Sequence, residues 1–355
     1  MDRALRNARE ARHWKHGCGM SRPGPRALFL GVCGCAVLAV MTYAALASRR
    51  STPKSVANAA DPPVEFVASV PDGPLILFRN ASPGPLYGRL AVVPLSRPGA
   101  PRRIAPLSCE RVHYAAGWGV CMINDETGLF VRYMAYVFDR SFQSRQTIAL
   151  TGTPIRARVA PDGRRAALTV FERGHSYADA GFSTRTIVID TASGRRLADL
   201  EEFAVEKDGT PFKSIDFNFW GVTFDRDGDQ FFATLKTHGE RYLVKGSVDA
   251  RRAAVVRRDV ECPSLSPDGS MVVFKKPLKH EVGWRLHVLD LATGVERALN
   301  QGSRSVDDQV DWFDDRQVVY HDSGPEGTAI WVLSVDGVTP PRLLLPNAYS
   351  PSVQR

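Results

Sequence analysis

Short apolar runs rich in β-branched and aromatic residues recur along the chain, and each follows a turn-forming segment. Runs such as LILF (75–78), AALTVF (166–171) and MVVF (271–274) have the length of single buried strands. The preceding Pro-Asp-Gly triplet forms a corner, because proline fixes φ and glycine accepts a positive φ. The complete triplet stands at residues 71–73, 161–163 and 267–269, and degraded copies stand at 117–119, 227–228 and 314–315.

These six copies follow a period of about 45 residues, apart from one insertion of about 20 residues before the fourth copy. A period of roughly 40 to 50 residues built from short strands is typical of propeller blades. Later in the period, the turn Asp-(Thr/Leu)-Ala-(Ser/Thr)-Gly recurs at 190–194 and 290–294. We therefore expect an all-β six-bladed β-propeller of four-stranded blades over residues 64–355, in which these turn residues are structural and not catalytic.

Two of these segments resemble the WD40-like repeat of the TolB-like six-bladed propellers. They are ARVAPDGRRAALTVF (157–171) and PSLSPDGSMVVFKK, which LHVLDLATG (286–294) follows, and the resemblance extends over residues 64–346. It implies export from the bacterial cytoplasm and binding of other envelope proteins through the propeller. The chain departs from TolB in having an apolar segment where TolB carries an N-terminal α/β domain.

The apolar segment runs from Ala27 to Ser48 without a charge. As a helix its 22 residues rise about 33 Å, enough for one transmembrane helix across a hydrocarbon core of roughly 30 Å. Seven Lys and Arg precede it in the basic tail 1–26 and three follow closely in the linker 49–63, which places the N-terminus in the cytoplasm and the propeller outside. The alternative is a cleaved signal peptide and a secreted protein, because small-x-small sites occur at 45–47 and 57–59.

The charge distribution argues against nucleic acid as a partner. The net charge is +8, but residues 1–60 hold 10 Lys and Arg against 2 Asp and Glu, which leaves 36 of each sign for residues 61–355. Because the predicted propeller is neutral, it lacks the basic surplus that phosphate contacts need.

No motif in the sequence points to catalysis, a metal or a cofactor. The G-x-S-x-G, H-E-x-x-H, Walker and G-x-G-x-x-G patterns are absent. Residues 225–229 (DRDGD) resemble a calcium loop, but the glycine comes too early, and an Asp-Gly hairpin is the simpler interpretation. We predict no catalytic residue, no metal site and no cofactor.

Long loops concentrate on the face of the predicted propeller opposite the Pro-Asp-Gly turns, and loops on a rigid scaffold commonly carry binding sites. Their mixed aromatic, amide and charged side chains suit an envelope protein, a peptide or a glycan. The alternative is that these loops only cap the propeller, with Trp220 and Trp284 in the core. The candidate binding residues are His175, Tyr177, Asp179, Asp216, Asn218, Trp220, His280, Trp284, Arg304, Asp307, Asp308, His321 and Asp322.

Two hypotheses for function follow. The favoured one is a membrane-anchored, extracytoplasmic propeller that acts as a non-catalytic binding or interaction scaffold in the cell envelope. The alternative is a propeller enzyme of the lactonase, glycosidase or dehydrogenase type, with a small extracytoplasmic substrate and polar groups that converge on the central channel.

Two structural links are also predicted. A hairpin centred on Ala115 would place Cys109 opposite Cys121 and allow a disulfide in an oxidising compartment, whereas the alternative is two buried thiols. Residues 346–353 look like the first strand of another blade, and we expect them to pair with blade one and close the ring.

Overall fold

The computed structural model describes residues 25–50, 64–172, 183–278, 282–324 and 327–355. The chain divides into two compact units, Met1–Ala57 and Asn58–Arg355. The first unit contains the helix α1 (Pro25–Arg50), whose composition is mainly small and apolar. Within the described ranges, no helix combines the length and the apolar character that crossing a membrane requires.

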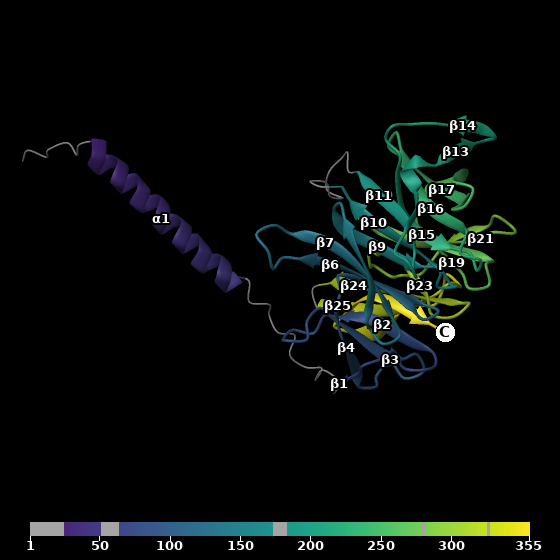
Figure 1. Cartoon of the computed structure of the whole chain (residues 1–355), viewed down its shortest axis with the longest axis horizontal. Helices are drawn as coiled ribbons and strands as arrows, with labels where there is room; N and C mark the ends of the chain where they lie inside the picture. Colours follow the sequence, from purple (N-terminus) through teal and green to yellow (C-terminus); the bar gives the residue numbers. More distant parts are fainter. Residues whose placement is uncertain (1–24, 51–63, 173–182, 279–281, 325–326) are drawn as a thin grey trace, which may run out of the picture. The chain divides into compact units, whose positions relative to one another are not determined.

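The second unit contains six sheets, each built on four antiparallel strands, which confirms the predicted six-bladed propeller (Figure 1). Blade one contains β2 (Leu75–Asn80), β3 (Arg89–Pro94), β4 (Arg102–Ser108) and β27 (Ala348–Gln354). Blade two contains β5 (Arg111–Ala115), β6 (Trp118–Asp125), β7 (Arg132–Asp139) and β8 (Ser144–Leu150). Blade three contains β9 (Thr153–Val159), β10 (Arg165–Phe171), β11 (Thr184–Asp190) and β12 (Arg196–Asp199).

The remaining blades repeat this order of strands. Blade four contains β15 (Asn218–Phe224), β16 (Gln230–Thr237), β17 (Glu240–Ser247) and β18 (Arg252–Arg258). Blade five contains β19 (Glu261–Leu265), β20 (Met271–Pro277), β21 (Trp284–Asp290) and β22 (Glu296–Ala298). Blade six contains β23 (Asp311–Trp312), β24 (Gln317–Gly324), β25 (Gly327–Ser334) and β26 (Arg342–Pro346). The inner strands, which contact one another around the central channel, are β5, β9, β15, β19, β23 and β27.

The ring closes through β27, as predicted. This strand pairs with β2 in antiparallel register, with Leu75 opposite Gln354 and Ile76 opposite Val353. Blade one is therefore built from both ends of the propeller sequence. The hydroxyl groups of Ser350 and Ser352 also accept hydrogen bonds from the backbone N–H groups of Val112 and Tyr114 in blade two, at 3.1 and 2.9 Å.

Two further elements extend the outer edges of blades. The insertion before the fourth blade forms a 3-10 turn, η1 (Leu200–Glu202), and the hairpin of β13 (Ala204–Lys207) and β14 (Thr210–Phe212). Strand β13 joins β18 in parallel, so blade four is part of a six-stranded sheet. Strand β1 (Val64–Phe66) covers the outer strand β4 of blade one in the same way.

The hydrophobic core lies between neighbouring blades. The buried faces of blades two and three meet through Val120, Val137, Leu168 and Ile189, all of which are fully buried. Comparable clusters join the other blades, because both faces of each sheet are covered. This packing fixes the inner strands and therefore the side chains that point into the channel.

Cys109 and Cys121 are joined by a disulfide, with their Cα atoms 5.2 Å apart. The register that we expected for this hairpin is wrong. Ala116 and Gly117 form a two-residue turn with positive φ, so Ala115 pairs with Trp118 and Val112 lies opposite Cys121. Cys109 precedes β5, and the disulfide therefore links the segment between β4 and β5 to β6.

Candidate functional site

The central channel opens at two faces. At the short-turn face, the inner strands end and the Pro-Asp-Gly turns begin. At the long-loop face, the inner strands begin, after the links between blades and beside the loops between second and third strands. The cavity at the short-turn mouth has a volume of about 320 Å³, whereas the one at the long-loop mouth has about 30 Å³.

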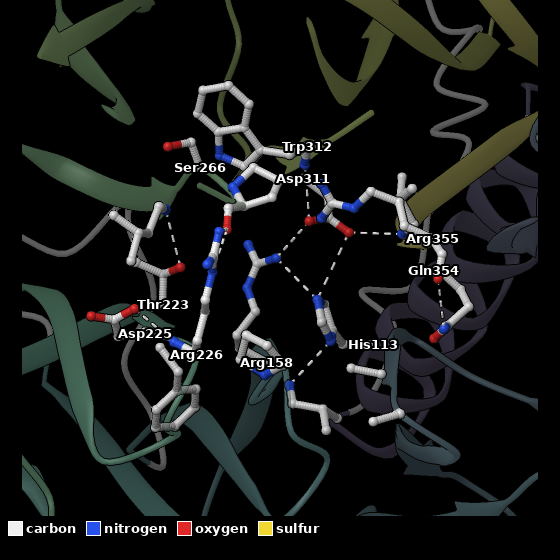
Figure 2. A pocket seen from close by; sticks show the side chains of 18 residues that line it. His113, Arg158, Thr223, Asp225, Arg226, Ser266, Asp311, Trp312, Gln354 and Arg355 are labelled. Carbon is white, nitrogen blue, oxygen red and sulfur yellow. Dashed lines mark hydrogen bonds and ion pairs between the residues drawn. The ribbon is translucent and has the colours of Figure 1, made fainter. Parts of the chain in front are cut away.

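A buried polar cluster of Arg158, Asp311 and His113 closes the channel below the larger cavity, and we call it the channel plug (Figure 2). The three side chains come from the inner strands β9, β23 and β5. Arg158 Nη1 donates to Asp311 Oδ1 at 3.0 Å, and Nη2 donates to the carbonyl oxygen of Val310 at 2.9 Å. Asp311 Oδ2 also accepts the N–H of Val353 at 2.7 Å, so the plug connects blade three to blade six and to the closing strand.

His113 is neutral in the plug. Its Nδ1 accepts the N–H of Val159 at 3.1 Å, and its Nε2 lies 3.0 Å from Arg158 Nη1 and 3.8 Å from Asp311 Oδ2. Protonation of both ring nitrogens would break the bond to Val159 and place a second positive charge against the Arg158 guanidinium. Burial, and then the nearby Arg158 charge, lower the pKa of His113 to about 3.

Asp311 stays ionised although it is buried. Burial alone would raise its pKa, but the charge of Arg158 and the hydrogen bond from the Val353 N–H outweigh that effect and lower the pKa. The plug therefore holds one fixed positive charge, one fixed negative charge and a neutral imidazole around neutral pH. It can lock the ring and present a rigid floor to whatever enters the cavity.

The cavity at the short-turn mouth has a polar rim. The Arg226 guanidinium donates to the carbonyl oxygen of Pro267 by bonds of 2.9 and 2.8 Å, and Asp225 Oδ1 accepts the backbone N–H of Arg226 at 2.7 Å (Figure 2). Thr223 Oγ1 accepts the N–H of Leu265 at 3.1 Å, which joins blades four and five along the wall. Over the described part of the chain, no group of three or more His, Cys, Asp or Glu side chains is placed to hold a metal ion.

The candidate binding residues of the long-loop face fall into three groups. His175, Tyr177, Asp179 and His280 lie outside the described residues. Trp220 is fully buried and packs with Ile155, Phe171 and Cys262, so it belongs to the core. The others make contacts within the fold.

Two of these candidates accept hydrogen bonds at the start of blade four. Asn218 Oδ1 accepts the N–H of Thr184 at 2.7 Å and so ties blade four to blade three. Asp216 accepts the N–H of His238 at 2.8 Å and the hydroxyl groups of Ser214 and Thr237. Hydrogen bonds from these hydroxyls lower the pKa of Asp216 to about 2.

Blades five and six bring the remaining candidates together in pairs. Asp308 pairs with His321 at 2.5 Å, and Arg304 pairs with Asp322 at 3.1 Å. Asp307 pairs with Lys275, whose ammonium also lies over the ring of Trp284. The structure thus brings most of these side chains into internal contacts near the long-loop mouth.

Sequence reasoning missed the channel plug. The signal was available, because His113 and Arg158 each stand between apolar residues in the strand sequences RVHYA and PIRARV. Side chains alternate along a strand, so in an inner strand such residues face the neighbouring blade or the channel. Their partner Asp311 lies 153 residues from Arg158, and only the closed ring brings the two together.

Fold and site together define a six-bladed β-propeller with a plugged channel and an open cavity at the short-turn mouth. The structure is similar to TolB from Acinetobacter baumannii, with a TM-score of 0.56, 16% identity, and coverage of 79% of this chain and 67% of that chain. It is also similar to a chain in the nidogen/laminin complex, with a TM-score of 0.52, 13% identity, and coverage of 79% and 98%. No family model matches the sequence, and no curated protein matches it. The fold is therefore a TolB-like six-bladed propeller.

Proposed function

We propose that this protein is a non-catalytic, protein-binding propeller of the cell envelope, with its partner at the short-turn mouth. The observation that carries the proposal is the cavity of about 320 Å³ above a floor that hydrogen bonds and an ion pair hold in place. A preorganised concave site of this kind binds a partner segment with little reorganisation cost. The similar propeller in the nidogen/laminin complex supports a protein partner.

The chemistry of the rim favours a polypeptide segment. Arg226 and Thr223 offer polar contacts, while Phe224 and Leu265 form an apolar part of the cavity wall. This combination of polar and apolar contacts is typical of protein interfaces. The long-loop face is the alternative surface, as the sequence indicated. Its described candidate residues are mostly engaged with one another, which favours the short-turn mouth.

Site-specific photo-crosslinking in the native host tests this assignment. A crosslinking amino acid at Arg226, which is exposed at the short-turn mouth, should capture a discrete protein, and the same residue at Leu129 on the long-loop face should not. A separate Arg226→Glu substitution should weaken recovery of that partner by at least tenfold while the circular dichroism spectrum stays unchanged. Capture from Leu129 alone would instead assign binding to the long-loop face.

We further propose that residues 27–48 anchor the protein in the cytoplasmic membrane with the propeller outside. The uncharged stretch of 22 residues and the excess of Lys and Arg before it support this topology. A periplasmic reporter fused after Arg355 should be active, and a cytoplasmic fluorescent reporter should be dark. The full-length chain should remain with the membrane after alkaline washing, whereas release of a shorter chain would indicate signal-peptide cleavage.

A further inference from the structure

A buried lysine stands out beside the plugged channel. Lys275, on β20, is the only lysine among the described residues that is buried, and its side chain is inaccessible to solvent. Directly opposite it in the β19–β20 register lies Glu261, which is also buried. The third member is Asp307, in the link that leads from blade five to blade six.

The contacts of Lys275 bring an amine and two carboxyl groups together. Its Nζ contacts Asp307 Oδ1 directly and lies 3.8 Å from Glu261 Oε2. The Trp284 ring covers the ammonium, with its centroid 4.2 Å from Nζ, and so shields the Lys275 amine from water. Removing these charges from water costs a large desolvation free energy. A neutral amide formed from the two groups would not carry that cost.

We propose that Lys275 and Asp307 condense to an intramolecular isopeptide bond, with Glu261 as the proton shuttle. This is a modification of the fold itself and does not depend on the proposed binding function. It joins the second strand of blade five to the segment that enters blade six.

The reaction balances without an added reagent. The Lys275 ammonium first passes a proton to the Asp307 carboxylate, and the free Nζ lone pair then attacks Asp307 Cγ. The new C–N bond forms as one C–O bond breaks, and the departing oxygen leaves as water with two of the three ammonium protons. The third proton stays on the amide nitrogen, so no oxidant or reductant is consumed.

Glu261 is suited to carry the protons between nitrogen and oxygen. Burial raises the pKa of its carboxyl group, although the charges of Lys275 and Arg241 oppose that shift. A carboxyl group that holds a proton near the pair can donate it to the Asp307 oxygen and recover one from the amine. Because Asp307 is half exposed on its other side, the released water has a path to solvent.

Intact mass spectrometry of the full-length chain, reduced and denatured, tests the proposal. The wild type should be lighter than its sequence by one water, and a digest should contain a branched peptide that includes both Lys275 and Asp307. Asp307→Asn should be lighter by one ammonia, because the side-chain amide leaves as ammonia. The full sequence mass in folded wild-type protein would overturn the proposal.

Two further variants serve as matched controls. Glu261→Gln keeps the shape of the side chain but cannot shuttle protons, so it should fold and retain the full sequence mass. Lys275→Arg keeps the charge but lacks the amine nucleophile, and it should also retain the full mass. Loss of water in Lys275→Arg would point to a cyclic imide at an aspartate and would contradict the isopeptide bond.

Discussion

Arg158 and Asp311 depend on each other because both are buried, at 8% and 6% exposure. Each charge has been removed from water, and their mutual bonds compensate for the hydration that they lost. The neutral His113 beside them adds no charge to the balance. At the scale of single residues, we therefore expect a substitution in the channel plug to lower the free energy of unfolding more than a substitution at the surface.

Asp311→Asn should destabilise the propeller by about 3–5 kcal/mol, because it leaves the buried Arg158 without its carboxylate. Urea denaturation followed by tryptophan fluorescence measures the change. The control is Asp72→Asn, which removes a carboxylate that is 93% exposed and pairs with the exposed Arg140 at the surface. That control should unfold at the wild-type urea concentration, and an equal loss in both variants would contradict the role of the plug.

The low pKa of His113 predicts a specific pH dependence. In the unfolded chain His113 titrates near 6.5, but in the fold its pKa is about 3, so only the unfolded state gains a proton as the pH falls below 6.5. Folding stability should therefore drop by ~2 kcal/mol between pH 7.5 and pH 5 from this residue alone.

The measurement is urea denaturation at several pH values, with His113→Asn as the comparison. Asparagine can accept the Val159 N–H but does not titrate, so the variant should lose ~2 kcal/mol less than the wild type over the same interval. Parallel pH profiles for the two proteins would show that His113 does not hold a depressed pKa.

At the scale of elements, β27 is the strand on which the ring depends. Its removal would leave β2 with a free edge, uncover the buried Ile76 and Phe78 that pack with β27, and leave two backbone N–H groups of β5 without their serine partners. Deletion of residues 348–354 should lower the melting temperature by roughly 10 °C or more. Thermal melting by circular dichroism reports this, with Arg355→Ala as a control that should melt like the wild type.

The disulfide between Cys109 and Cys121 holds the start of blade two. It closes a segment with a sequence separation of 12 residues, and a loop of that size contributes ~3 kcal/mol in the chain-entropy description. Cys109→Ser with Cys121→Ser should therefore unfold at a lower urea concentration than the wild type. Peptide mapping should find both cysteines unlabelled before reduction and labelled after it, and labelling without reduction would exclude the bridge.

Edge strands show how the fold limits association with other chains. The added strand β14 is only three residues long and carries Pro211, which has no N–H to offer to an incoming strand. Strand β1 covers the outer edge of blade one in a comparable way. These additions protect the blades at positions where a free ladder would otherwise face solvent.

At the scale of the whole molecule, the fold was predictable because it repeats. Pro-Asp-Gly turns fix a corner by local backbone chemistry, so blade number, blade order and the closing strand could be inferred from the chain alone. The register of the Cys109 hairpin could not, since Ala116 supplies a positive φ that its residue type does not indicate. The channel plug is a product of closure, because it joins Arg158 to Asp311 across the ring.

The closing strand also imposes an order on biosynthesis. Blade one begins with β2, yet its inner partner β27 is synthesised after every other strand of the propeller. Until then the inner edge of β2 is open, and an unpaired apolar strand edge is a template for aggregation. The nascent chain therefore needs either fast release of its last residues or a chaperone that shields β2.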